Sequence, residues 1–483
     1  TGTRFVRTKE GLGVDRLDTA SLRSSEVEMP RRFASSYLTD GRGNVRLMQA
    51  DEYSGEMLTG RVRFSFRPEG SKSWKELTEY IDPDEFQPLA VDGTINALYA
   101  LKPLDGRKAL YRIKLTDPVS TELVVSHPRV DIDQVIRSGN GQRVIGYSFA
   151  EEKREVTYFD PEYKALAGAL GRAMKMPMID FGNASADGSK IIIHGGADSD
   201  PGRYYLFDKA GKKLNELFLV RPELENRTLA QVKPVSVKAQ DGTAIPAYLT
   251  LPVGKEAKNL PAVVLPHGGP SSRDEWGFDW LAQYLAARGY AVLQPNYRGS
   301  AGYGDAWLME NGFKSWKTSI GDITASAKWL ADQGIADRNR LAIVGWSYGG
   351  YAALQAAATE PGLFKSVAAV APVTDLVLLK QEANEYTSGR IVERFIGSGP
   401  HVTEGSPLQR ARDIKVPVLL VHGDMDLNVG IAHSTKMDAA LKSSGAPVQF
   451  LRYKSLDHQL EDSAARTEML SAVGALLERT IGR

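Results

Sequence analysis

"RLAIVGWSYGGYAALQAA" (residues 340–357) joins a run of β-branched and aliphatic residues to an alanine-rich segment through the turn "GWSYGG". The apolar run predicts a buried strand, and the alanine-rich segment predicts a helix. Glycines on both sides of one serine are typical of a strand-to-helix turn that is too tight for side chains and leaves the serine hydroxyl exposed. We therefore predict that Ser347 is a nucleophile at the end of a strand.

Strand and helix patterns alternate around this turn from about residue 232 onward, which predicts a mostly parallel, doubly wound α/β sheet covered on both faces. The predicted buried strands are "PAVVLPHGG", "YAVLQPNYR", "RLAIVGWS", "SVAAVAPV", "VPVLLVHGD" and "VQFLRYKS". The predicted helices are "DWLAQYLAARG", "DITASAKWLADQG", "GGYAALQAAATE", "HSTKMDAALKSSG" and "ARTEMLSAVGALLERTIG". Residues 235–252 precede them as a predicted hairpin around Asp241-Gly242.

Two sequence markers recur in the N-terminal half. Glycine-marked turns followed by apolar runs begin at Asp40, Asp92, Gly139 and Asp187, and a second strand-like marker begins at Arg61, Leu110, Val156 and Tyr204. Both recur about every 50 residues, as expected for β-propeller blades, whereas one irregular β-sandwich would not keep two markers in phase. We predict an all-β propeller of about four to five blades over residues 1–225, with "RFVRTKEGLGVDRLDTASLR" (4–23) ending a further blade, and an α/β-hydrolase domain over residues 226–483.

Composition excludes several classes of function. The chain has 483 residues, 42% of them hydrophobic and 25% charged, and its net charge of +1 gives no general attraction to nucleic acid or to anionic membranes. It contains no cysteine, which excludes disulfides, thiolate metal sites and cysteine nucleophiles. No apolar run approaches a membrane span, and "TGTRFVRTKEGLG" lacks the apolar stretch of a signal peptide. We expect a soluble, processed or incomplete chain of undetermined compartment, cytoplasmic or periplasmic.

A nucleophilic serine needs a base, and that base is nearly always histidine. The seven histidines are His127, His194, His267, His401, His422, His433 and His458. In the hydrolase fold the acid and then the histidine follow the serine at the ends of later strands. His401 and His433 fall in irregular or helical segments, and His422 precedes the acid candidates. His458, after the last strand, is therefore the predicted base.

The acid is expected after the strand "VPVLLVHGD", where the segment "HGDMDLNVG" offers Asp424 and Asp426. A buried carboxylate beside the second histidine nitrogen fixes the tautomer and stabilises the imidazolium. The residue pattern alone does not choose between these two acids. Asp457, next to His458, is more typical of a solvated residue or a loop cap.

Oxyanion donors are expected at two places. One is the backbone N–H of Tyr348, the residue after the nucleophile. The other lies in the loop "LPHGGPSSRDEW" after the first parallel strand, where Gly268 and Gly269 allow close approach of the backbone.

Together these segments resemble the prolyl oligopeptidase family of serine peptidases, in particular its bacterial acylaminoacyl-peptidase-like branch. The blocks "PAVVLPHGGP", "GYAVLQPNYRGSAGYG", "GWSYGGYAAL", "HGDMDLNV" and "LDH" stand in the order of the family, behind a propeller. The resemblance makes Ser347 the nucleophile, His458 the base and Asp426 the acid. It also pairs the Tyr348 N–H with a glycine N–H of the "HGGP" loop, for which we prefer Gly269.

The resemblance also implies a propeller that admits short peptides and excludes folded proteins, with no cofactor and no metal. Family propellers have seven or eight blades, so we expect about 150 N-terminal residues to be missing from this chain. Family members selective for proline line the S1 pocket with aromatic residues after the "APV" turn, where this chain is aliphatic. We predict an S1 pocket formed by Val373, Leu376 and Val429, with His267 as a further substrate contact and a broad apolar preference.

The predicted function is that of a serine peptidase, of the oligopeptidase or acylaminoacyl-peptidase type, which cleaves short peptides through an acyl-enzyme. A dipeptidyl peptidase is the alternative, because Glu151-Glu152 could anchor a free amine, although two adjacent acids are usually a solvated edge. An esterase or amidase, or a propeller binding module with an inactive hydrolase half, are the others. Nucleic acid and membranes are not expected as partners, and a homo-oligomer stays open.

Overall fold

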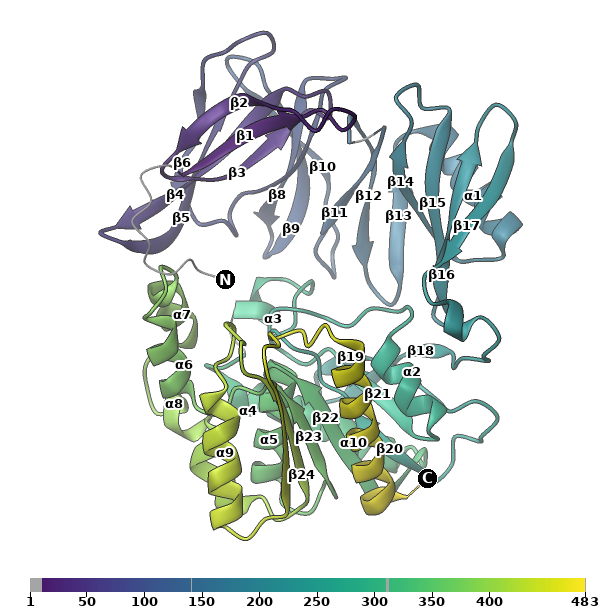
Figure 1. Cartoon of the computed structure of the whole chain (residues 1–483), viewed down its shortest axis with the longest axis vertical. Helices are drawn as coiled ribbons and strands as arrows, with labels where there is room; N and C mark the ends of the chain where they lie inside the picture. Colours follow the sequence, from purple (N-terminus) through teal and green to yellow (C-terminus); the bar gives the residue numbers. More distant parts are fainter. Residues whose placement is uncertain (1–10, 140, 310–311, 483) are drawn as a thin grey trace.

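Five antiparallel sheets form the N-terminal part of the chain, whose computed structural model describes residues 11–139, 141–309 and 312–482. Strands pair in chain order within each sheet (Figure 1). The first two sheets contain β1 (Leu12–Leu17) and β2 (Ser24–Arg31), then β3 (Ala34–Thr39), β4 (Val45–Ser54), β5 (Met57–Phe66) and β6 (Lys75–Ile81). The third contains β7 (Gln87–Asp92), β8 (Ala97–Leu104), β9 (Arg107–Lys114) and β10 (Ser120–Val125). The last two contain β11 (Gln134–Ser138), β12 (Arg143–Ala150) and β13 (Arg154–Tyr158), then β14 (Met178–Ala184), β15 (Lys190–Ala197), β16 (Asp200–Asp208) and β17 (Lys213–Leu219).

The repeated sequence markers occupy equivalent places in four of these sheets. Each glycine-marked turn joins the first strand of its sheet to the second, and each second marker lies in the third strand. The turn aspartates accept local backbone N–H groups: Asp92 Oδ1 accepts from Thr94 at 2.8 Å, and Asp187 Oδ1 accepts from Ser189 at 3.0 Å. Such side-chain turns explain the aspartate in three of the four markers, those at Asp40, Asp92 and Asp187.

Two of these sheets have fewer than four strands. The sheet β11–β13 has three strands and is followed by helix α1 (Pro161–Met174), which packs against β13 and β14. The helix starts here because Asp160 caps it and Pro161 occupies its first turn. The sheet β1–β2 has two strands, and residues 4–10 of the segment predicted to end a further blade lie outside the described residues.

An eight-stranded sheet organises the C-terminal part, in the order β18-β19-β21-β20-β22-β23-β24-β25. Its strands are β18 (Val232–Lys238), β19 (Ala244–Thr250), β20 (Leu260–Val264), β21 (Ala291–Pro295), β22 (Ala336–Trp346), β23 (Val367–Val370), β24 (Val418–Gly423) and β25 (Val448–Tyr453). The hairpin β18–β19 is antiparallel and joins β21 antiparallel, whereas β20 to β25 pair in parallel. The predicted strands and the predicted hairpin are all present, so the α/β-hydrolase prediction is confirmed.

Helices cover both faces of this sheet. The helices of this part are α2 (Trp280–Ala287), α3 (Asp305–Met309), α4 (Trp316–Asp332), α5 (Tyr348–Thr359), α6 (Leu376–Ala383), α7 (Gly389–Ile396), α8 (His401–Glu404), α9 (Ala432–Ser443) and α10 (Ser463–Ile481), with 3-10 turns at Pro222–Leu224 and Pro407–Asp413. Leu285 of α2 and Leu477 of α10 are fully buried on one face. Leu330 of α4, Leu354 of α5 and Leu441 of α9 are fully buried on the other. The short helices α3, α6, α7 and α8 have no counterpart among the predicted helices.

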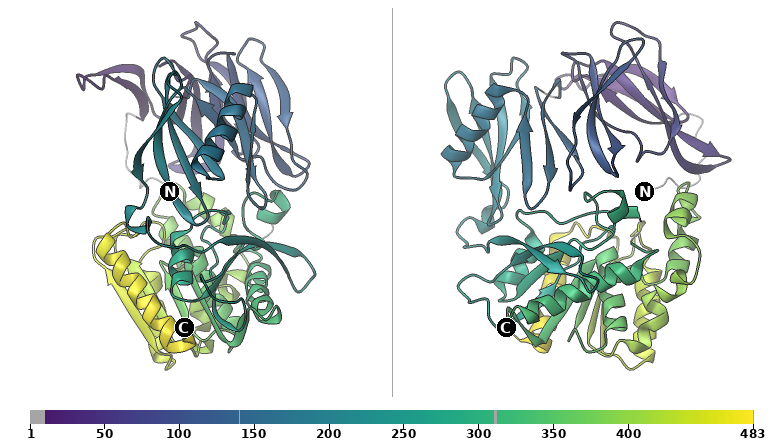
Figure 2. Two further views of the ribbon diagram at one scale, coloured as in Figure 1. Left: turned by 90° about the vertical axis from the view of Figure 1, so that its right-hand side faces the viewer. Right: turned by 180° about the vertical axis from the view of Figure 1, so that it is seen from behind.

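One end of the propeller strands faces the hydrolase, and the hairpins β4–β5 and β8–β9 lie at this end, as Figure 1 and the view from behind in Figure 2 show. The amide of Leu58, in β5, donates to the carbonyl of Thr387 at 2.9 Å, ahead of α7. The amide of Asp305 donates to the carbonyl of Gly106, in the β8–β9 turn, at 2.9 Å. No helix in the described part of the chain is long and apolar enough to cross a membrane.

Candidate active site

Ser347 lies at the sharp turn between β22 and α5, with φ 59° and ψ −120°. This left-handed conformation is strained for a residue with a side chain and is held by the hydrogen bond from the Ser347 amide to the Val370 carbonyl, at 2.8 Å. A Cβ on Gly345 would lie 2.1 Å from the Gly349 carbonyl oxygen, and one on Gly349 would lie 2.2 Å from that of Pro266. Only glycine fits at both positions, so the glycines create the turn that presents Ser347.

The first residue of α5, Tyr348, contributes an N–H that has no acceptor within the helix. Its side chain is 1% exposed and stacks on Tyr297 at 5.6 Å between ring centroids. The buried ring fixes the start of the helix, so the amide next to Ser347 is available to an anion at a constant position.

The glycine loop after β20 runs alongside the serine. A Cβ on Gly268 would lie 3.5 Å from the Ser347 Cβ, so the loop backbone approaches the serine closely. The Gly268 carbonyl oxygen is 2.7 Å from His267 Nδ1, and the Gly269 N–H, antiparallel to that carbonyl across the trans peptide, points away from the imidazole. Gly269 has φ +120°, a conformation that favours glycine.

His458 and Asp426 form a buried pair. The distance between His458 Nδ1 and Asp426 Oδ2 is 2.6 Å, and the carboxylate is fully buried. Asp426 Oδ1 accepts the amides of Asn428 and Val429 at 2.8 and 2.9 Å. Burial alone would raise the pKa of Asp426, but hydrogen bonds from His422, His458 and the Val429 amide hold this pKa well below its usual value. Asp426 is therefore an ionised acceptor that orients the His458 ring.

The loop of His458 is tied to the serine turn. Trp346, the residue before Ser347, donates its indole N–H to the His458 carbonyl at 3.1 Å. The Met425 amide donates to the Leu456 carbonyl at 2.9 Å and joins the acid loop to the histidine loop. Because β22, β24 and β25 are parallel, their carboxyl ends meet at one edge of the sheet, where ligands bind in open α/β folds. The structure thus pairs Asp426 with His458 and ties the His458 loop to the turn that carries Ser347.

The neighbouring acids have other partners. Asp424 Oδ1 accepts the Ser455 amide at 2.7 Å, and its Oδ2 is 3.4 Å from Arg452 Nη2. Asp457 Oδ1 accepts the Gln459 amide at 3.0 Å, as a loop cap does. The structure therefore pairs Asp426, and not Asp424, with His458.

His422 is a contact of the site that the sequence reasoning did not assign. Its Nε2 lies 2.9 Å from the Val429 carbonyl oxygen and 3.2 Å from Asp426 Oδ2, and its Nδ1 lies 2.7 Å from Ser434 Oγ. A carbonyl only accepts, so Nε2 carries the proton and also faces the carboxylate. The four-residue spacing to Asp426 in "HGDMD" was the available signal.

The predicted S1 residues are buried: Val373, Leu376 and Val429 are 3%, 0% and 4% exposed. They lie in the hydrophobic cluster on the α5 face of the sheet, and their role as a pocket stays a prediction. His267 is partly exposed, and burial lowers its pKa to about 4, so it is neutral at neutral pH. Its Nε2 is 2.7 Å from Ser300 Oγ.

The acids proposed to anchor an amine have different surroundings. The Glu151 carboxylate forms an ion pair with Arg129, and the Glu152 side chain is exposed. The Glu152 carbonyl, however, accepts a hydrogen bond from Tyr248 Oη of the hydrolase at 2.9 Å. The backbone of this turn therefore faces the hydrolase, while one of its two carboxylates already has a cationic partner.

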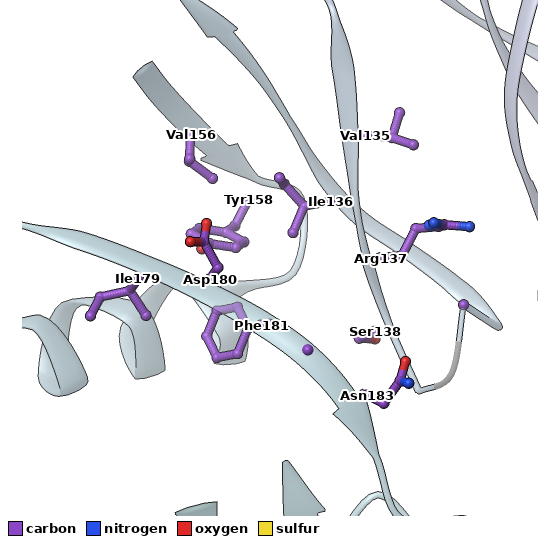
Figure 3. Close-up of a pocket in the computed structure, with 12 residues that line it drawn as sticks. Val135, Ile136, Arg137, Ser138, Val156, Tyr158, Ile179, Asp180, Phe181 and Asn183 are labelled. Carbon is purple, nitrogen blue, oxygen red and sulfur yellow. The ribbon is translucent and has the colours of Figure 1, made fainter. Parts of the chain in front are cut away.

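A separate cavity of about 440 Å³ lies between β11 and β14 of the propeller. Figure 3 shows Arg137, Tyr158 and Asp180 among the side chains around it. Its lining contains none of the predicted catalytic or oxyanion residues. Among the described residues, no group of three or more His, Cys, Asp or Glu side chains could hold a metal ion.

The fold and site define a class of protein: α/β hydrolases with a nucleophile-elbow serine and an N-terminal propeller. Residues 276–483 match the model of the prolyl oligopeptidase family, and this part of the chain belongs to that family. It is 30% identical over 394 residues to dipeptidyl aminopeptidase BIII of Pseudoxanthomonas mexicana, covering 77% of this chain and 55% of that protein. It is 27% identical over 492 residues to dipeptidyl peptidase family member 6 of Caenorhabditis elegans, covering 94% and 66%. The chain thus spans between about half and two thirds of these relatives.

Solved structures share the whole architecture. A puromycin-hydrolyzing peptidase of Mycobacterium tuberculosis superposes with a TM-score of 0.74 at 23% identity, covering 96% of this chain and 72% of that one. An acylaminoacyl peptidase in complex with Z-Gly-Gly-Phe-chloromethyl ketone superposes with a TM-score of 0.73 at 19% identity, covering 97% and 73%. These similarities confirm the predicted combination of propeller and hydrolase.

Proposed function

We propose that the chain is a serine peptidase that hydrolyses short peptides through an acyl-enzyme. The observation that carries this proposal is the buried His458–Asp426 pair, whose loop is tied through the Trp346 indole to the turn that presents Ser347. The membership of residues 276–483 in the prolyl oligopeptidase family supports the same reaction. We also divide the chain into a propeller up to residue 225 and a hydrolase domain from residue 226, between the end of β17 and the start of β18.

The proposed reaction follows from the roles that these side chains can fill. Ser347 Oγ attacks the peptide carbonyl while its proton moves to His458 Nε2, and Asp426 stabilises the resulting imidazolium. The N–H groups of Tyr348 and Gly269 stabilise the oxyanion. His458 then protonates the leaving amine, the C–N bond breaks, and water hydrolyses the ester by the same steps.

The test is hydrolysis of chromogenic peptide anilides by the purified chain, with Ser347→Ala as the blank. Loss of the nucleophile lowers kcat by about 10⁶-fold in enzymes of this kind. Fluorophosphonate should label the wild type at Ser347 and leave the variant unlabelled. Equal hydrolysis by both proteins would refute the assignment of Ser347.

The same assay separates oligopeptidase and dipeptidyl activity. The similarity to relatives that are named dipeptidyl peptidase or dipeptidyl aminopeptidase supports the removal of dipeptides by this chain. The ion pair between Arg129 and Glu151 argues against it, because Arg129 competes with a substrate amine for the Glu151 carboxylate. Cleavage of N-blocked apolar anilides supports the oligopeptidase or acylaminoacyl type. Cleavage of free-amine dipeptidyl anilides alone would instead assign Glu151 and Glu152 to amine binding.

A further inference from the structure

A turn of the propeller is hydrogen-bonded to the hydrolase next to the glycine loop. This turn joins β12 to β13, and Arg273 donates from Nη1 to the Ala150 carbonyl at 2.9 Å and from Nη2 to the Glu151 carbonyl at 3.2 Å. Tyr248 Oη donates to the next carbonyl, that of Glu152, at 2.9 Å. Hydrogen bonds from hydrolase side chains thus reach three consecutive carbonyls of one turn.

An ion pair also joins the propeller to the hydrolase here, with the donor on the propeller side. Arg154, the first residue of β13, places Nε 3.0 Å from Glu275 Oε2 and Nη2 2.5 Å from Oε1. The same guanidinium binds Asp133 of the propeller through Nη1 and Nη2, at 2.7 and 3.0 Å. The neighbouring Lys153 ammonium lies 3.9 Å from the centroid of the Trp276 ring. Two-point contacts of a planar guanidinium fix direction as well as distance.

Apart from Tyr248 of β19, the hydrolase residues in these contacts belong to the glycine loop itself. Arg273 and Glu275 follow Gly269 by four and six residues. The loop is also bonded to the segment 299–305, because the Ala301 amide donates to the Ser272 carbonyl at 2.8 Å. That segment has its own propeller contact, from the Asp131 amide to the Gly302 carbonyl at 2.9 Å. Propeller contacts therefore reach the glycine loop directly and through its neighbour.

We propose that the β12–β13 turn is a clasp that sets the position of the glycine loop (residues 267–276), with Arg154, Arg273 and Glu275 as positioning residues. The proposal rests on the proposed function, because it assigns an oxyanion donor to this loop. An oxyanion donor acts only from a fixed position, and loss of one lowers kcat by about 10²–10³-fold. The reactive geometry of the hydrolase part thus depends on the propeller.

The test variant is Glu275→Gln, which removes the interdomain charge and leaves the Arg154–Asp133 pair intact. The matched control is Glu478→Gln, which neutralises the partner of Arg288 in an ion pair that lies wholly within the hydrolase. We expect kcat of Glu275→Gln on a short peptide anilide to fall about tenfold with KM within about twofold, a part of the loss of a whole donor. The control should keep both parameters.

Hydrogen exchange distinguishes this proposal from the proposed function. The amides of residues 267–276 should exchange faster in Glu275→Gln than in the wild type, at an unchanged midpoint of thermal unfolding, whether or not a peptide is cleaved. Arg273→Met, which removes the contacts to the turn carbonyls, should have the same effect. Unchanged kcat and exchange in both variants would overturn the clasp. An inactive wild type would refute the proposed function, and exchange alone would then decide the clasp.

Discussion

Replacing Asp426 with asparagine tests the central pair of the site. Asp426 accepts two backbone amides on Oδ1 and faces the N–H groups of His458 and His422 with Oδ2. An asparagine has one acceptor oxygen and one NH₂ donor in their place. If the asparagine oxygen accepts the two backbone amides, the NH₂ group faces the N–H groups of both imidazoles. In the reverse orientation the NH₂ group faces the two backbone N–H groups.

The size of the effect follows from the tautomer of His458. An NH₂ group opposite Nδ1 makes that nitrogen the acceptor, so Nε2 carries the proton and cannot receive one from Ser347. The same change of tautomer in a serine protease lowers kcat by about 10⁴-fold. Each buried donor left without an acceptor costs about 1–3 kcal/mol, so the free energy of unfolding should also fall.

The neighbouring acid provides the matched control. Asp424→Asn makes the same change two residues away, on a carboxylate whose partners are the Ser455 amide and Arg452. We expect its kcat/KM on a peptide anilide to stay within about twofold of the wild type, since asparagine can still accept the Ser455 amide and the ion-pair partner Arg452 is exposed. Denaturant unfolding of both variants would separate lost catalysis from lost fold. An inactive Asp424→Asn beside an active Asp426→Asn would refute the assignment of the acid.

Two further predictions concern stability. Gly349→Ala places a methyl group 2.2 Å from the Pro266 carbonyl oxygen and should lower the free energy of unfolding by about 3 kcal/mol. The control Gly321→Ala lies in open space on α4 and should raise the free energy of unfolding by about 0.5–1 kcal/mol. Equal denaturant midpoints of the two variants would contradict the close approach at the turn. Burial and the nearby Asp279 carboxylate raise the pKa of Asp274 to about 8, so the folded state keeps a proton that the unfolded state loses near pH 3.8, and stability falls as the pH rises between these values. Asp274→Asn mimics the protonated acid, so its stability advantage over the wild type should grow by about 3–4 kcal/mol from pH 5 to pH 8, and a constant difference would contradict the shift.

Local features of the chain account for the parts of the site that could be predicted. The glycines around Ser347 are required by contacts within the turn and with the segment that follows β20, so their pattern in the sequence identified the elbow. His458 followed from the order of strands, because parallel strands bring the residues after them to one edge. The recurring glycine-marked turns identified the blades, and in three of the four an aspartate stabilises its own turn.

Other parts depend on contacts between distant segments. The residue pattern left Asp424 and Asp426 open, and the choice lies in a turn that directs one toward Ser455 and the other toward His458. His422 was set aside as a base because it precedes the acids, yet the same turn returns to it and places Asp426 beside it.

The sequence by itself determined the class of fold, the serine turn and the order of the triad residues, because strand periodicity, glycine geometry and chain order are local properties. The residue pattern did not choose between the two acids, although the family resemblance selected Asp426. Only the tertiary structure showed the contact between Asp426 and His458 and which parts of the propeller touch the hydrolase. Arg154 and Glu275 are 121 positions apart. Their pairing depends on how the two parts of the chain are placed relative to each other, and that placement is the sum of many weak contacts that no short stretch of sequence contains.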